Sequence, residues 1–128
     1  MPRKPSSQPN EVEMSILRVL WDRGPSTVRQ VHEALSGRDT GYTSTLKMMQ
    51  VMFEKRLLAR DESQRPQVYR PAAPEEHTQK QIVRDLIQKV FGGSARKLVL
   101  RAVESQKLPP DEVAAIRELL KKLEGDKK

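Results

Sequence analysis

The sequence predicts a mostly α-helical fold with a small β-hairpin: a winged helix-turn-helix followed by a helical dimerisation region. Six segments carry apolar residues at the three- to four-residue spacing of amphipathic helices. Two of the first three are joined by a short polar connection containing glycine, which is the spacing of a helix-turn-helix. Two strand-like pieces, residues 57–61 and 67–71, flank a polar tip and predict the hairpin.

The composition favours a folded, helix-rich protein and excludes several kinds of chemistry. The 128 residues suit one compact domain or two small ones. Without cysteine the chain has no disulfides, thiolate metal sites or cysteine nucleophiles, which fits a reducing, cytoplasmic location. Aromatic residues make up only 4%, which argues against stacking of single-stranded nucleic acid, whereas the net charge of +7 suggests a polyanionic partner.

We expect three parts and no membrane insertion. The parts are a flexible N-terminal arm at 1–9, a winged-helix domain at 10–73 and a helical dimerisation region at 74–128. No apolar run approaches the roughly 20 residues that cross a bilayer. The stretch MPRKPSSQP also lacks the apolar segment of a secretion signal.

The first helix begins at Asn10. Its side chain can accept a hydrogen bond from the backbone of Glu13, and the Glu13 side chain can reach back, which makes a capping box. The pair Gly24-Pro25 ends the helix. Its predicted apolar face consists of Met14, Leu17, Leu20 and Trp21.

The second and third helices make up the helix-turn-helix. Ser26 is expected to cap the second helix, and Gly37 to end it. The predicted core face of this helix consists of Val28, Val31 and Leu35. After the connection at 38–41, the third helix is expected from about Tyr42 to Arg56.

Three more amphipathic helices follow the hairpin, over about 75–91, 94–105 and 110–125. Ser94 is a good cap for the second of them, and Pro110 is a good first residue for the third. This tail is small for a separate domain yet strongly apolar on one side, so we expect it to pack against a second copy. The expected dimerisation residues are Ile82, Leu86, Val90, Leu98, Val113, Ile116, Leu120 and Leu123.

Little in the sequence points to an enzyme, a metal site or a cofactor. His32 and His77 lie in different segments outside any ligand motif, and are expected to be ordinary helix-face residues. Met49 and Met52 are expected to pack in the core, because a soft metal would need cysteine or histidine nearby. Met48 lies at the edge of that stripe, and the sequence leaves open whether it faces the core or a partner.

The opposite face of the third helix has the composition of a DNA-reading surface. It consists of Tyr42, Thr43, Ser44, Lys47 and Gln50. Hydroxyls and a helix N-terminus can bind phosphates, while Lys47 and Gln50 can reach base edges in the major groove. The further predicted phosphate contacts, at the start of the second helix and on the hairpin, are Thr27, Arg29, Arg60, Arg65 and Arg70.

Four stretches carry a resemblance to a known family: EVEMSILRVLWDRGPSTVRQVHEAL, GYTSTLKMMQVMFEKRLLAR, QVYRPAAP and FGGSARKLVLRAVES. They are similar to the BlaI/MecI penicillinase-repressor family of bacterial winged-helix regulators, which also includes the copper-responsive CopY repressors. The resemblance covers about residues 10–124. It implies a DNA-binding winged helix, a helical dimerisation region, a palindromic promoter site and release of repression by an upstream signal.

Three of the departures of this sequence from the family pattern concern cleavage, metal binding and the backbone. In the beta-lactam branch, a membrane sensor triggers cleavage between Asn and Phe after the Leu-Val-Leu stretch, whereas the equivalent bond here joins Arg101 and Ala102. The copper branch binds metal through a C-terminal cysteine cluster, which this chain lacks. The family usually has glycine where this chain has Arg56, a residue that would be strained at a positive φ.

We interpret the chain as a dimeric repressor that binds a palindromic operator in double-stranded DNA, with no cofactor or metal. An upstream signal, for which a sensor protease is one source, would relieve repression. A basic protein-interaction module and a ligand- or metal-responsive regulator on the same scaffold are the alternatives. Salt-dependent binding to a palindrome separates the repressor from the interaction module.

Overall fold

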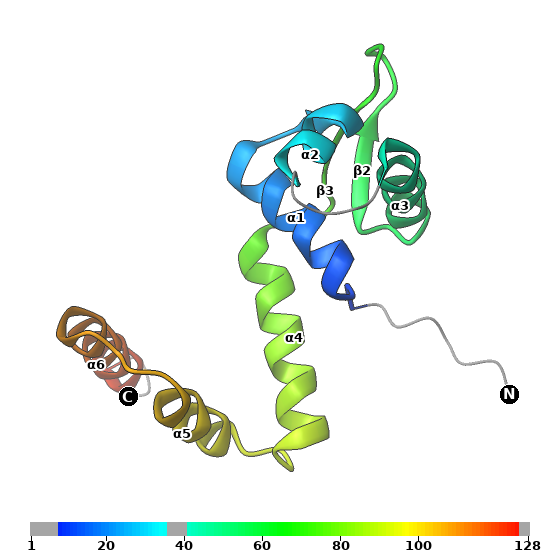
Figure 1. Ribbon diagram of the computed structural model, residues 1–128. Coiled ribbons are helices and arrows are strands. Elements are labelled where there is room, and N and C mark those ends of the chain that lie inside the picture. Colours follow the sequence, from blue (N-terminus) through cyan, green and yellow to red (C-terminus); the bar gives the residue numbers. More distant parts are fainter. Residues whose placement is uncertain (1–7, 36–40, 126–128) are drawn as a thin grey trace, which may run out of the picture. The chain divides into compact units, whose positions relative to one another are not determined.

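The computed structural model describes residues 8–35 and 41–125 (Figure 1). The predictions for the N-terminal arm, for Gly37 and for the connection after it fall mostly outside these residues. Within the described ranges the chain has six helices and three short strands, so the mostly helical fold class is confirmed. The chain divides into two compact units at the bond between Val83 and Arg84.

Helix α1 (Glu11–Arg23) opens with the predicted capping box. Asn10 Oδ1 accepts from the backbone N–H of Glu13 at 2.8 Å, and Glu13 Oε1 accepts from the backbone N–H of Asn10 at 2.9 Å. The Glu13 side chain is buried, and its second oxygen pairs with Lys55 Nζ at 3.0 Å. The cap therefore also ties the start of α1 to the residue that follows α3.

The buried face of α1 consists of Glu13, Ile16, Leu17 and Leu20. The predicted apolar face omitted Ile16, while its members Met14 and Trp21 are half-buried and pack against the core. Trp21 lies at the edge of the core, where its indole Nε1 donates to the carbonyl of Ala73 at 3.1 Å. A polar handle on a large ring favours such an edge position.

The sheet has three antiparallel strands in the order β1-β3-β2, where the sequence predicted a two-stranded hairpin. The two predicted pieces form β2 (Leu58–Asp61) and β3 (Val68–Pro71). The additional strand is β1 (Ser26–Thr27), in which Ser26 lies opposite Tyr69. A strand of two residues shows no period, so the sequence carries no signal for it.

Helix α2 (Val28–Ala34) has a different cap from the predicted one. The Ser26 hydroxyl donates to the carbonyl of Gly24 at 2.9 Å, and the cap is Thr27, whose Oγ1 accepts from the backbone N–H of Gln30 at 3.2 Å. In return, Gln30 Oε1 accepts from the backbone N–H of Thr27 at 2.9 Å. The prediction of a Ser26 cap is wrong, because a second capping box begins one residue later.

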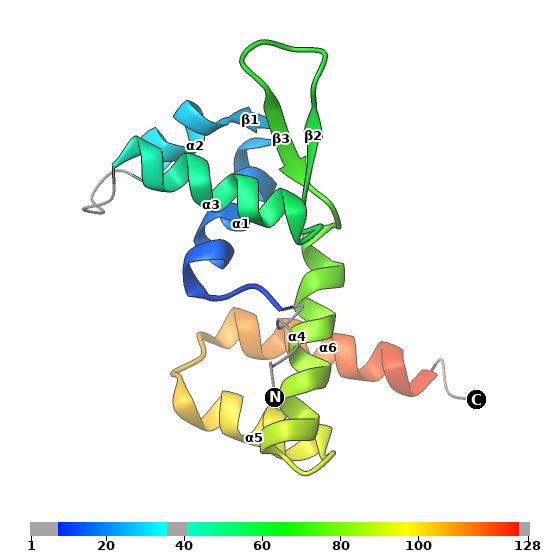
Figure 2. The same cartoon turned by 90° about the vertical axis from the view of Figure 1, so that its right-hand side faces the viewer.

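Helix α3 (Tyr42–Glu54) packs the predicted methionine stripe into the core. Met49 and Met52 are fully buried, and Met48 is half-buried against the same core, which settles the side that the sequence left open. The core is completed by buried residues of α1, α2 and the sheet, namely Ile16, Leu17, Leu20, Val28, Val31, Leu58 and Tyr69. Figure 2 shows α2 and α3 side by side, with the tip between β2 and β3 extending beyond both.

The end of α3 is a Schellman motif built without glycine. The backbone N–H of Leu57 donates to the carbonyl of Met52 at 2.9 Å, and that of Arg56 donates to Phe53 at 3.1 Å. Arg56 has φ 67°, in the left-handed region that favours glycine. The helix therefore ends at Glu54, before the predicted Arg56, and the positive φ considered for that residue is confirmed.

The C-terminal helices are α4 (Glu75–Val90), α5 (Ala95–Ser105) and α6 (Pro110–Gly125). Ser94 caps α5 as predicted, since its Oγ accepts from the backbone N–H of Lys97 at 3.2 Å. None of these three described helices has a buried residue. Their exposed large apolar side chains are Val83, Leu86, Val90, Val99, Leu100, Val103, Ile116, Leu119, Leu120 and Leu123. None of the helices in the described ranges is long and apolar enough to span a membrane.

Candidate nucleic-acid interface

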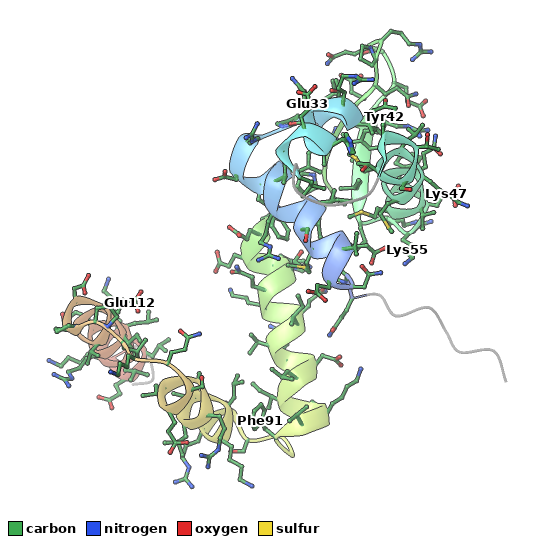
Figure 3. The ribbon with its side chains drawn as sticks, viewed as in Figure 1. Glu33, Tyr42, Lys47, Lys55, Phe91 and Glu112 are labelled. Carbon is green, nitrogen blue, oxygen red and sulfur yellow. The ribbon has the colours of Figure 1, made fainter. Side chains whose placement is uncertain are left out.

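The outer face of α3 is open to solvent along its length. All five residues predicted for the reading face are exposed, namely Tyr42, Thr43, Ser44, Lys47 and Gln50. The first turn of α3 contains no acidic residue, and Gly41 at the cap position has no side chain that could accept from the first N–H groups of the helix. Lys47 projects outward from α3 in Figure 3. This face therefore offers hydroxyl, amide and ammonium groups without a nearby acid in the first turn.

Helix α2 holds the first turn of α3 through aromatic contacts. The guanidinium carbon of Arg29 lies 4.7 Å from the centre of the Tyr42 ring, which is within cation–π range. The His32 ring meets Tyr42 edge-on, with centroids 6.0 Å apart and planes at 88°. His32 Nδ1 also lies 2.9 Å from the buried hydroxyl of Thr45. The sequence predicts only an ordinary helix-face residue at His32, and no local pattern indicates this link between the two helices.

A groove of about 360 Å³ lies between the start of α2, the start of α3 and β3. Three of the predicted contact residues line it, namely Thr27, Arg29 and Tyr42. Gln67 lines it from the hairpin side, and Glu33 adds one acidic group. The structure thus brings together predicted residues that lie far apart in the sequence.

The hairpin tip is ordered by one carboxylate. Asp61 Oδ1 accepts from the backbone N–H of Ser63 at 3.0 Å and from its hydroxyl at 2.6 Å, while Oδ2 accepts from Gln64 Nε2 at 3.0 Å. These bonds, first the one from the Ser63 hydroxyl, lower the pKa of Asp61 below its ordinary value. Arg65 at the tip is exposed, and its Nη1 donates to the backbone carbonyl of Glu62 at 2.9 Å.

Arg60 is placed differently from Arg65. Its guanidinium carbon lies 3.9 Å from the centre of the Phe53 ring, and its Nη2 donates to Glu62 Oε1 at 2.6 Å. The Glu62 carboxylate, and then the Tyr69 side chain, raise the pKa of Arg60 above its ordinary value. Two predicted phosphate contacts of the hairpin therefore differ: Arg65 faces solvent at the tip, and Arg60 packs against α3.

The cleavage-equivalent bond lies inside a helix. Arg101 and Ala102 are in the middle of α5, both exposed, and the Arg101 guanidinium pairs with Glu104 one turn later.

The predicted dimerisation residues Ile82, Leu98 and Val113 are half-buried, and the other five are exposed. Across the described ranges, no three His, Asp or Glu side chains converge as metal ligands would.

Comparison with known proteins agrees with this geometry. The family model described as penicillinase repressor matches residues 10–122. Two relatives, each called Transcriptional regulator BlaI and coming from Mycobacterium tuberculosis strains CDC 1551 / Oshkosh and ATCC 25618 / H37Rv, are 33% identical over 118 residues. That alignment covers 90% of this chain and 84% of each relative. The chain therefore belongs to the penicillinase repressor family, a family of transcriptional repressors and not of enzymes.

Proposed function

We propose that the protein is a cytoplasmic homodimeric repressor that binds a palindromic operator in double-stranded DNA, and that an upstream signal releases it. The observation that carries the proposal is the exposed, polar face of α3, which begins with an acid-free turn and lies beside Arg29. A helix of this kind fits the major groove of B-DNA and enters it with its N-terminal residues forward.

Lys47 and Gln50 are the proposed base-reading residues of α3. Both are exposed and lie on the same side of the helix, close to one turn apart. A lysine can donate to guanine O6 and N7, and a glutamine can bond adenine N6 and N7. Thr43 and Ser44, at the start of the helix, are better placed for phosphate, because short hydroxyls and free helix N–H groups both suit an anion.

The remaining proposed contacts bind the DNA backbone on either side of α3. The Thr27 hydroxyl oxygen accepts from Gln30, which leaves its proton free to donate to a phosphate. Arg29 contributes charge beside Tyr42, and Arg65 contributes charge at the exposed tip. These contacts would position the protein on the duplex, while α3 supplies the sequence preference.

The proposed dimer is built by the C-terminal helices. Ten large apolar side chains of these helices are exposed in the single chain. On α6, the side chains of Leu119, Leu120 and Leu123 are each more than half exposed. Apolar surface of this extent is costly in water and marks an association site. A symmetric dimer would in turn require a palindromic operator, since two-fold protein symmetry matches two-fold site symmetry.

The proposed release step is proteolysis within α5, prompted by a sensor protease. A protease needs an extended strand, so the helix around Arg101 and Ala102 would have to open first. That opening is expected to be easy in the single chain, because α5 buries no residue. Cleavage there would separate α6 from the rest of the chain and weaken the proposed dimer.

Selection from a randomised duplex library, with the full-length protein as bait, tests this proposal. The expected result is a palindrome whose affinity falls steeply with salt, because lysine and arginine displace condensed counterions. The protein should also be dimeric at the concentrations used. Enrichment of no duplex, or of one with no two-fold symmetry, would contradict the proposal and favour a protein-interaction module.

A further inference from the structure

Arg60 makes contacts with two other elements and with the start of the tip. Its guanidinium carbon lies over the ring of Phe53, in the last turn of α3, at 3.9 Å from the ring centre. The same carbon lies 5.9 Å from the ring centre of Tyr69 in β3. Its Nε and Nη2 both donate to Glu62 Oε1, at 3.2 and 2.6 Å.

These contacts leave Arg60 little freedom. Only 19% of its side chain is exposed, compared with 61% for the Glu62 side chain that pairs with it. Phe53 is half-buried and packs against the core of the first unit, so the ring under the guanidinium is itself held in place. An arginine held on both its face and its edge would have to break contacts within the protein before it could bind a phosphate.

Arg65 provides the contrast within the same hairpin. It is exposed, and its two hydrogen bonds go to the backbone carbonyls of Glu62 and Gln64, at 2.9 and 3.4 Å. Glu62 therefore touches both arginines: its carboxylate accepts from Arg60 and its carbonyl accepts from Arg65. Contacts run in sequence from Phe53 on α3 through Arg60 and Glu62 to Arg65 at the tip.

We infer that Arg60 is a positioning residue, which fixes the hairpin tip relative to α3 so that Arg65 meets the DNA, and that Arg60 makes no phosphate contact of its own. The inference rests on the proposed function, because it concerns how the hairpin meets the duplex. A planar guanidinium is required, since a lysine ammonium cannot both cover the Phe53 ring and direct two donors at one carboxylate oxygen.

The test compares Arg60 with Arg65 as matched variants on a palindrome selected by the wild-type full-length protein. Arg60→Met and Arg60→Lys should both lower the affinity, by roughly tenfold, as expected for losing a stacked and paired guanidinium. Arg65→Met should lower it by a similar factor, whereas Arg65→Lys should retain most of it, because a phosphate needs charge more than shape. Trp21 fluorescence during unfolding confirms that each variant is folded at the assay temperature.

Two double variants separate positioning from direct contact. If Arg60 acts through the tip, Arg60→Met should cost little further affinity in an Arg65→Met protein. Phe53→Leu should reproduce the Arg60→Met loss, and the two changes together should lose little more than either alone. If Arg60→Met does not fold, Arg60→Lys and Phe53→Leu, each combined with Arg65→Met, take its place.

Three outcomes would overturn the inference while leaving the proposed function intact: wild-type affinity in Arg60→Lys, wild-type affinity in Arg60→Met, or additive losses from Arg60→Met and Arg65→Met. Failure of the wild-type protein to select any palindrome would instead overturn the proposed function. The two failures are therefore distinguishable within one set of measurements.

Discussion

The two units of the chain differ in how completely they bury their apolar residues. All nine buried apolar side chains in the described ranges lie between Ile16 and Tyr69, within the first unit, which contains the winged helix. The C-terminal helices are just as amphipathic in sequence, yet they bury none. An apolar helical stripe thus predicts a helix in both units, but whether the stripe is covered depends on what packs against it. The buried core of the described residues lies in the first unit, whereas the apolar faces of the C-terminal helices are exposed in the single chain.

The largest expected effect comes from placing a charge on the exposed apolar face of α6. Leu120→Asp would place an unpaired carboxylate in the proposed dimer interface, at a cost of about 4 kcal/mol, which lowers the dimerisation constant roughly a thousandfold. Light scattering after size exclusion should then show a monomer. Lys122→Asp, on the opposite side of α6, should remain dimeric. A Leu120→Asp protein that stays dimeric would show that this helix does not build the interface.

A cavity in the covered core should have the next largest effect. Met49 is fully buried, and Met49→Ala should lower the free energy of unfolding of the winged-helix unit by about 2–5 kcal/mol. Denaturation followed through Trp21, the sole tryptophan, measures it. The matched control is Leu119→Ala, because Leu119 is 57% exposed and lies in the other unit. Equal losses in the two variants would mean that the units do not differ as described.

The reading face should affect DNA binding without affecting stability. Lys47→Ala should weaken binding to the selected palindrome by about 1–3 kcal/mol, or roughly 5- to 150-fold, and leave the dimer intact. Fluorescence anisotropy at physiological salt measures the affinity. Lys107→Ala, which removes another exposed charge, between α5 and α6, should change it little. Equal affinity of Lys47→Ala and the wild type would contradict the assignment of α3.

The smallest expected effect is a gain in stability. Arg56→Gly removes a left-handed conformation that costs an ordinary residue roughly 1–2 kcal/mol, although glycine loses about 0.5–1 kcal/mol of chain entropy on folding. The net stabilisation should be below about 1 kcal/mol in the same unfolding assay. Arg56→Ala keeps the Cβ atom and should bring no gain. A destabilised Arg56→Gly protein would mean that the arginine side chain contributes more than its backbone costs.

Local signals predicted most of the elements, because caps and periodic stripes act over a few residues. The Asn10 capping box, the Ser94 cap and the Met49 and Met52 stripe were each evident from spacing alone. The cap at Ser26 was misplaced by one residue because Ser26 and Thr27 are both good caps, and spacing alone does not show that the Ser26 hydroxyl donates to the carbonyl of Gly24 instead.

The sequence predicts which residues of α3 are exposed, but it does not predict the contacts that distinguish one hairpin arginine from the other. Exposure of Lys47 and Gln50 followed from helical phase. The difference between Arg60 and Arg65 depends on Phe53 lying under one of them, which requires the packing of β2 on α3. The link from His32 to Thr45 likewise joins two helices across a connection, so no local pattern carries it.

The short strand β1 couples the start of α2 to the hairpin. Thr27 is at once the cap of α2 and the partner of Val68 in β3, so the start of α2 and the hairpin share one sheet. A displacement of the tip would therefore be passed along β3 to the first turn of α2. Base pairs that only change groove width under the hairpin should then alter the proposed phosphate contact at Thr27, which is a route to indirect readout of sequence.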